Sequence, residues 1–177
     1  MFTAANNISQ FNLSRADGVL GLGLPQLTTL PGAPFVEAAF AQKAISSPVF
    51  AFHLSSTTGS EFHLGGVNTS LFNAAEGFET HNVSAISPGF WQLSGTSVSV
   101  AGSKAASGFE AIIDSSTTIM FGSPALVKNV YAKIPGSKPV DPKQAGGFVG
   151  FYSIPCGTDP KLSFAWGGKE WPISAQE

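Results

Sequence analysis

Short apolar or alternating runs, each broken within a few residues by Gly, Pro or Ser, are the feature that most limits the folds open to this chain. Such runs predict strands, because strand side chains alternate between two faces and because Gly and Pro end pairing or form turns. The fold class is therefore predicted to be mostly β, with one hairpin across the Ser/Thr/Gly segment 55–60 and another across the turn at 167–169. The predicted strands are residues 49–54, 61–64, 90–93, 96–100, 111–113, 164–166 and 170–173.

Two helices are predicted between the strands. Residues 34–43 begin with Pro34, which suits the first turn of a helix, and their apolar side chains fall on one face. A second helix is predicted after Ser123, a favourable N-cap that is followed by Pro124 and by apolar residues at helical spacing. It is expected to end at residues 135–136, a Pro-Gly pair that stops helices.

Length and composition exclude several classes of partner. The 177 residues suffice for one domain or for parts of two small ones, and 43% are hydrophobic, so a buried core is expected. Charged residues make up 11%, against roughly 25% in an average soluble domain. The formal net charge is −2 and the Lys and Arg residues are scattered singly, so neither nucleic acid nor an anionic membrane is expected as a partner. No stretch approaches the roughly 20 apolar residues that span a bilayer.

Four N-x-S/T sequons favour a secreted protein, because this tripeptide is the acceptor for N-linked glycans. They begin at Asn7, Asn12, Asn68 and Asn82. The residues after Met1 form neither a basic nor an apolar segment, so no signal peptide is visible and the true N-terminus is expected upstream. We predict that Asn68 and Asn82 are surface positions, since each follows a predicted strand.

Residues 111–119 (Ala-Ile-Ile-Asp-Ser-Ser-Thr-Thr-Ile) are the most informative stretch for chemistry. Residues 111–113 are suited to a strand buried on both faces, and Asp114 follows them with four hydroxyl residues behind it. One interpretation is a strand-to-turn connection in which Asp and Ser cap backbone donors. The other is a carboxylate at the mouth of a core strand, held ionised by hydroxyl donors. Glu110 is interpreted as a solvated strand start.

Other chemistries find little support in the pattern. His53, His63 and His81 form no HExxH motif or Cys/His cluster, so no metal is expected and each histidine is interpreted as solvated or satisfied. The glycines within residues 18–23 are not in dinucleotide-binding order, and no Gly-x-Ser-x-Gly elbow occurs. No cofactor is expected.

Residues 111–119 resemble the second active-site loop of pepsin-like aspartic proteases (family A1), whose pattern is two apolar residues and then Asp-Thr/Ser-Gly-Thr/Ser. Further segments resemble the family in the order that the family has them, so the resemblance covers nearly the whole chain. These segments are residues 17–23 (Asp-Gly-Val-Leu-Gly-Leu-Gly), 34–43, 62–68 (Phe-His-Leu-Gly-Gly-Val-Asn), 90–93 (Phe-Trp-Gln-Leu) and 152–156 (Tyr-Ser-Ile-Pro-Cys). The last of them, residues 152–156, resembles the half-cystine strand of fungal members of the polyporopepsin type.

The resemblance implies an incomplete pepsin-like acid protease fold, which in the family consists of two β lobes with one Asp loop each. Residues 1–73 would be the remnant of the N-terminal lobe, and residues 74–177 the C-terminal-lobe portion that carries the second Asp loop. The first Asp loop and the substrate-covering flap are expected before Met1, and the strand that threads beneath the second loop is expected after Glu177. Taken alone, Cys156 is either a free thiol or a small buried hydrophobe; the resemblance implies a partner after Glu177, so we predict a free thiol.

The function that the resemblance implies is an aspartic-type endopeptidase, a hydrolase that activates water between two Asp carboxylates sharing one proton. Asp114 would be a catalytic residue, with Ser115 and Thr117 as supporting hydrogen-bonding neighbours. The expected partner is a peptide or protein substrate, and the full-length relative is expected outside the cell. Ser116 departs from the pattern, because it stands where the family has Gly and risks a clash or an unfavourable backbone angle.

Two alternatives stay open beside the active enzyme. One is a non-catalytic remnant or peptide-binding pseudoenzyme, which Ser116 and the missing first Asp favour. The other is completion of the site by a second chain, either the missing lobe or another copy in which two Asp114 residues meet. Because one carboxylate cannot perform the dyad's chemistry, this chain alone is expected to be inactive.

Overall fold

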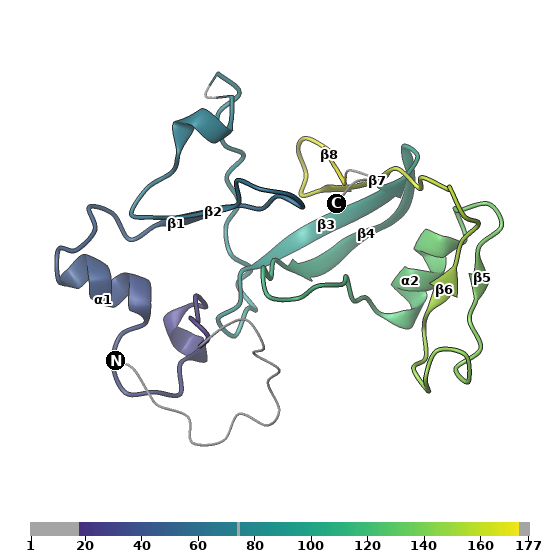
Figure 1. The fold of residues 1–177 in the computed structure, drawn as a ribbon, viewed down its shortest axis with the longest axis horizontal. Helices are drawn as coiled ribbons and strands as arrows, with labels where there is room; N and C mark the ends of the chain where they lie inside the picture. The colour runs from purple at the N-terminus through teal and green to yellow at the C-terminus, as the bar shows by residue number, and fades with distance from the viewer. Residues whose placement is uncertain (1–17, 74, 174–177) are drawn as a thin grey trace. The chain divides into compact units, whose positions relative to one another are not determined.

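A computed structural model describes residues 18–73 and 75–173, and these residues form short strands with a few helices (Figure 1). The described residues form two compact units: residues 18–73 and 75–78 with 88–90, and residues 79–87 with 91–173. The assignment of the units to the two lobes of the family stays a prediction. The elements of the first unit are η1 (Pro25–Leu27), α1 (Phe35–Ala41), β1 (Phe50–His53), β2 (Glu61–Leu64) and η2 (Thr69–Leu71). Those of the second are β3 (Gln92–Val100), β4 (Ser103–Ile112), α2 (Pro124–Tyr131), β5 (Lys138–Pro139), β6 (Tyr152–Ser153), β7 (Leu162–Ala165) and β8 (Trp171–Pro172).

The first unit contains the predicted hairpin and the predicted first helix. Strands β1 and β2 pair antiparallel, with Phe52 opposite Phe62, and the centres of these two rings are 5.1 Å apart. Helix α1 is shorter than the predicted 34–43, because it ends at Ala41 and Lys43 takes a positive φ of 60°, the left-handed conformation that terminates helices. Val36 is its buried residue.

The second unit is built on a four-stranded antiparallel sheet in the order β4-β3-β7-β8. The predicted C-terminal hairpin is confirmed, since β7 and β8 pair with Phe164 opposite Trp171. The sheet's buried centre is small: Val98 is 2% exposed and Val100 is 3% exposed, both on β3. Ala165 on β7 and Ile134 after α2 are also buried, at 7% and 5% exposure.

Strand β3 corrects the prediction of two separate strands at 90–93 and 96–100. Residues 92–100 form one strand, whose pairing with β4 shifts register between Leu93 and Thr96. Gly95 has a φ of +71°, which glycine adopts without a steric penalty. The short break in the apolar pattern is therefore a bulge inside a strand and not a turn between strands.

The end of β4 corrects the prediction of a strand buried on both faces at 111–113. Ile112 is 50% exposed and Ile113 is 52% exposed. Strand side chains point to the two faces of a sheet, so these exposures mean that the described residues leave both faces partly uncovered at this end of β4, which is an edge strand beside β3.

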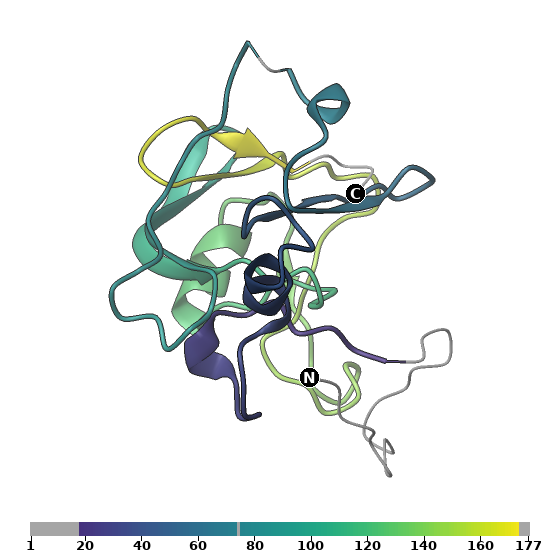
Figure 2. The same cartoon turned by 90° about the vertical axis from the view of Figure 1, so that its left-hand side faces the viewer.

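Helix α2 confirms the predicted cap at Ser123, whose Oγ accepts a hydrogen bond from the backbone N–H of Leu126 at 3.3 Å. Pro124 occupies the first turn, as predicted. The helix ends at Tyr131, four residues before the Pro-Gly pair, and the next turn is tighter, with the N–H of Ile134 bonded to the carbonyl of Tyr131 at 3.0 Å. Figures 1 and 2 show α2 beside β4.

Candidate active site

Asp114 lies just beyond the end of β4, at the start of an exposed turn. Pairing continues one residue past the strand, since the N–H of Ile113 donates to the carbonyl of Trp91 at 2.9 Å. The backbone that delivers Asp114 is therefore anchored to the sheet, while the carboxylate itself is exposed.

Both oxygens of the Asp114 carboxylate accept short hydrogen bonds. Oδ1 accepts from the backbone N–H of Ser116 at 2.8 Å and from its hydroxyl at 2.7 Å. Oδ2 accepts from the hydroxyl of Thr117 at 2.6 Å. This arrangement unites the two interpretations of the motif, because the carboxylate caps a turn and is also surrounded by hydroxyl donors.

These hydrogen bonds lower the pKa of Asp114 from 3.8 to about 2, with the hydroxyl of Thr117 as the largest cause and the hydroxyl and N–H of Ser116 next. Hydrogen bonds to the charged form favour that form, so the carboxylate stays ionised above about pH 2. Because the folded pKa lies below the ordinary value, the associated stabilisation is complete above 3.8 and is lost as the pH falls through about 2.

The sequence placed the supporting hydrogen bonds on Ser115 and Thr117, and the structure distributes them differently. Thr117 bonds the carboxylate, as expected. Among the described contacts of Asp114, the second hydroxyl belongs to Ser116 and none belongs to Ser115. An Asp bonded to the N–H two residues later is a common turn, so this spacing was the signal that could have identified Ser116.

Ser116 does not have the unfavourable backbone angle that its place in a glycine position suggested. Among the described residues, Lys43, Ala101 and Lys161 are the non-glycine residues with positive φ, and Ser116 is not one of them. Its side chain turns toward Asp114 and adds a donor. In this unit the serine is therefore accommodated without left-handed backbone strain.

We predict that Thr117→Val raises the pKa of Asp114 from about 2 toward 3.8, because it removes the largest cause of the lowering. Ser116→Gly should raise the pKa less, since the backbone donor remains. An NMR titration of the Asp114 carboxyl carbon between pH 1.5 and 6 measures both shifts, a range on the order of two units either side of ordinary Asp values. Thr118→Val is the matched control and should leave the pKa unchanged; an unchanged pKa in Thr117→Val would contradict the hydrogen-bonding account.

The apolar surroundings of the Asp114 turn are open to solvent. Ile113 before it is 52% exposed, and Ile119 after it is 51% exposed. Met120 and Phe121 follow at 65% and 80% exposure. An ionised carboxylate thus stands in a stretch of exposed hydrophobic side chains.

Two histidines in the described residues lie close to glutamates. His63 Nδ1 lies 3.1 Å from Glu61 Oε1. His81 Nε2 lies 3.0 Å from Glu79 Oε1, within ion-pair distance although the angle is not that of a hydrogen bond. Within residues 18–73 and 75–173, no three His, Cys, Asp or Glu side chains are placed to hold a metal ion, and no helix there could cross a membrane.

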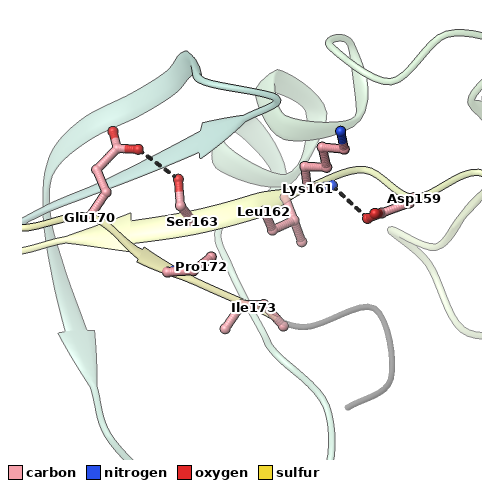
Figure 3. Close-up of a pocket in the computed structure, with 7 residues that line it drawn as sticks. All are labelled: Asp159, Lys161, Leu162, Ser163, Glu170, Pro172 and Ile173. Atoms are coloured by element: carbon pink, nitrogen blue, oxygen red, sulfur yellow. Dashed lines mark hydrogen bonds between the residues drawn. The ribbon is translucent and has the colours of Figure 1, made fainter. Parts of the chain in front are cut away.

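A pocket of about 390 Å³ opens elsewhere on the second unit (Figure 3). Its carboxylates accept hydrogen bonds: Glu170 from the hydroxyl of Ser163 at 3.1 Å and from that of Ser99, outside the lining, at 3.2 Å, and Asp159 from the N–H of Lys161 at 2.9 Å. None of its lining residues belongs to the Asp114 turn. These carboxylates are therefore explained by hydrogen bonds within the protein, and the pocket is not assigned a ligand.

Cys156 is exposed, and because it is the one cysteine of this sequence, its state as a free thiol stays a prediction. Asn82 is exposed and Asn68 is half-buried, so the prediction of surface positions is confirmed for Asn82 and only partly for Asn68. The sequons at Asn7 and Asn12 lie outside the described residues.

Comparison with known proteins supports the family resemblance. The chain is 34% identical over 166 residues to an aspartic protease of Phaffia rhodozyma, covering 93% of this chain and 40% of that protein. It is 32% identical to secreted aspartyl protease 1 of Malassezia globosa, covering 90% and 38%, and 28% identical to cathepsin E of Rattus norvegicus, covering 89% and 39%. The chain thus spans about two fifths of the length of these relatives. The model of the eukaryotic aspartyl protease family matches residues 1–177, and the chain belongs to that family.

Proposed function

We propose that this chain carries one half of the catalytic dyad of an aspartic-type endopeptidase, and that Asp114 is the catalytic carboxylate. The observation that carries the proposal is the hydrogen bonding of both carboxylate oxygens by Ser116 and Thr117, which keeps the pKa of Asp114 at about 2. Asp114 would therefore be ionised across the acid range in which such dyads operate.

In the proposed reaction, ionised Asp114 acts as the general base. It accepts a proton from a water molecule as the water oxygen attacks the peptide carbonyl carbon. A second, protonated carboxyl donates its proton to the carbonyl oxygen, which gives the tetrahedral intermediate. The C–N bond then breaks as Asp114 passes the proton taken from water to the amine nitrogen, and a hydroxyl of the intermediate returns a proton to the second carboxylate. Thr117 and Ser116 would keep Asp114 ionised. The substrate class is an extended peptide or protein, and no cofactor takes part.

We propose that the second carboxylate comes from outside the described part of this chain. The causes of the Asp114 pKa shift are hydrogen bonds and desolvation, with no contribution from another acid. A neighbouring carboxylate would raise this pKa, because like charges disfavour the ionised form. We therefore predict that the 177-residue polypeptide alone does not cleave acid-unfolded haemoglobin between about pH 3 and 6, a range set by dyad titration. Cleavage that Asp114→Asn removes would contradict this and would favour a dimer of this chain.

A chimera tests the proposed function directly. Residues matched to the Phaffia rhodozyma aspartic protease would replace the corresponding segment of that protein, which supplies the rest of the relative's length. We expect the folded chimera to cleave haemoglobin at acid pH and to be blocked by a statine-type inhibitor. A chimera that folds, as judged by circular dichroism and thermal melting, and does not cleave would contradict the proposal.

The pseudoenzyme alternative rests on Ser116, which stands where the family pattern has Gly. Introducing Ser116→Gly into the chimera distinguishes the two. Under the enzyme proposal, the chimera cleaves haemoglobin with and without the substitution. If cleavage requires Ser116→Gly, this chain is a non-catalytic member of its family.

We further propose an extracellular location, as the name of the secreted Malassezia globosa relative suggests for that protein.

A further inference from the structure

We propose that Asn82 is an N-linked glycan acceptor and that Asn68, which carries the same sequence signal, is not. The inference rests on the extracellular location proposed above, since the modification belongs to the secretory route. It concerns a surface of the chain that has no part in the chemistry of Asp114.

Asn82 lies in a segment that contacts the rest of its unit on both sides, through His81 and through Ser84. His81 turns inward, with Nε2 3.0 Å from Glu79 Oε1 and its ring centre 6.1 Å from that of Trp166. On the other side, the N–H of Ser84 donates to the carbonyl of Gln92 at 2.8 Å. Asn82 itself is exposed. A glycan on its side chain would therefore extend into solvent while both anchoring contacts are kept.

Both side chains that the modification uses at this sequon are unengaged in the described structure. Within residues 18–73 and 75–173, neither the Asn82 amide nor the Ser84 hydroxyl takes part in a hydrogen bond. In the transfer, Asn82 Nδ2 attacks the anomeric carbon of a lipid-pyrophosphate-linked oligosaccharide. The new C–N bond forms as the C–O bond to the pyrophosphate breaks, the lipid pyrophosphate leaves, and one Nδ2 proton is lost.

Asn68 is engaged at both ends of its amide. Its Nδ2 donates to Glu61 Oε2 at 3.0 Å, and its Oδ1 accepts from the N–H and the hydroxyl of Ser70 at 3.1 and 2.7 Å. Asn68 also caps η2, and Ser70 is the hydroxyl residue of this sequon. The carboxylate of Glu61 is held by Asn68 on one oxygen and His63 on the other. A glycan on Asn68 would displace this half-buried network, so folded protein should lack it.

The test is expression of the full chain, fused to a secretion signal, in a yeast host with Asn7→Gln and Asn12→Gln as background. Protein from the cells and protein from the medium would be collected separately, and each would be treated with an N-glycosidase in ¹⁸O-labelled water, which marks each formerly glycosylated Asn as a labelled Asp. The variants are Asn82→Gln, Ser84→Ala and Asn68→Gln. Asn129→Gln is the matched control, since Asn129 is exposed and lies outside any sequon. Because protein is collected from the cells as well as from the medium, glycan occupancy can also be measured for a variant that folds poorly and is not secreted.

We expect label at residue 82, and a loss of gel mobility shift in Asn82→Gln and Ser84→Ala but not in Asn68→Gln or Asn129→Gln. Ser84→Thr should retain the shift, because the hydroxyl is kept. An unlabelled Asn82 would overturn the acceptor assignment, and label at Asn68 in secreted, folded protein would overturn the discrimination. Glycan occupancy is read independently of peptidase activity, so failure here leaves the chimera result, and hence the proposed function, untouched.

Discussion

Asp114→Asn in the active chimera is expected to lower kcat/KM on unfolded haemoglobin by at least about 10²–10⁴-fold, the usual share of general acid–base catalysis. Asn has nearly the same shape as Asp but cannot hold the negative charge that accepts the proton of water. Members of a dyad act as a unit, so losing one removes more than its separate share. The hydroxyls of Ser116 and Thr117 would then face a neutral amide.

Asp141→Asn is the matched control for this substitution. Asp141 Oδ1 also accepts from a backbone N–H two residues later, that of Lys143 at 2.9 Å, and Asp141 is exposed. Its carboxylate therefore has the same kind of turn contact without the hydroxyl donors of Asp114. Activity should be unchanged in Asp141→Asn. An equal loss in both variants, or full activity in Asp114→Asn, would contradict the role assigned to Asp114.

Val98→Asp is expected to unfold the second unit. Val98 is 2% exposed at the centre of β3, opposite Ala106 of β4 and Phe164 of β7. A carboxylate there would lose its water without gaining a partner, at an effective cost of several kcal/mol. Single domains are stable by only about 5–15 kcal/mol, and this unit's buried centre is small.

Val149→Asp is the control, because it makes the same substitution at a valine that is 79% exposed. Circular dichroism and urea unfolding of both variants measure the difference. Val149→Asp should keep the unfolding free energy of the unaltered chain within about 0.5 kcal/mol, as surface substitutions usually do. If Val98→Asp unfolds at the same urea midpoint as the unaltered chain, the sheet centred on β3 is not what stabilises the unit.

Local signals in the sequence predicted much of the fold. The hairpins at 49–64 and 164–173 are confirmed because alternation and turn residues act over a few positions. The cap at Ser123 is confirmed for the same reason, since a hydroxyl and three backbone groups determine it. The motif around Asp114 pointed to the right family, which the comparison confirms.

Non-local features could not be predicted in this way. Whether Ile112 and Ile113 are buried depends on what packs over the two faces of β4, and periodicity does not contain that information. The single strand β3 was divided in prediction because a bulge at Gly95 looks like a turn from sequence alone. The hydrogen bond that the Ser116 hydroxyl donates to Asp114 was not predicted, because Ser115 was chosen from the family pattern and not from turn geometry.

Exposed hydrophobic side chains follow the Asp114 turn, and a molecule that bound to them would also affect the conformation of the turn. Ile119, Met120 and Phe121 are 51–80% exposed, and covering a fully exposed side chain of this kind contributes about 1.5–3 kcal/mol. A binding surface that covers these side chains gains this free energy of burial only when the turn adopts the conformation that presents them to that surface. Binding at this face and rigidity of the carboxylate would then be thermodynamically coupled, each raising the equilibrium constant of the other by the same factor.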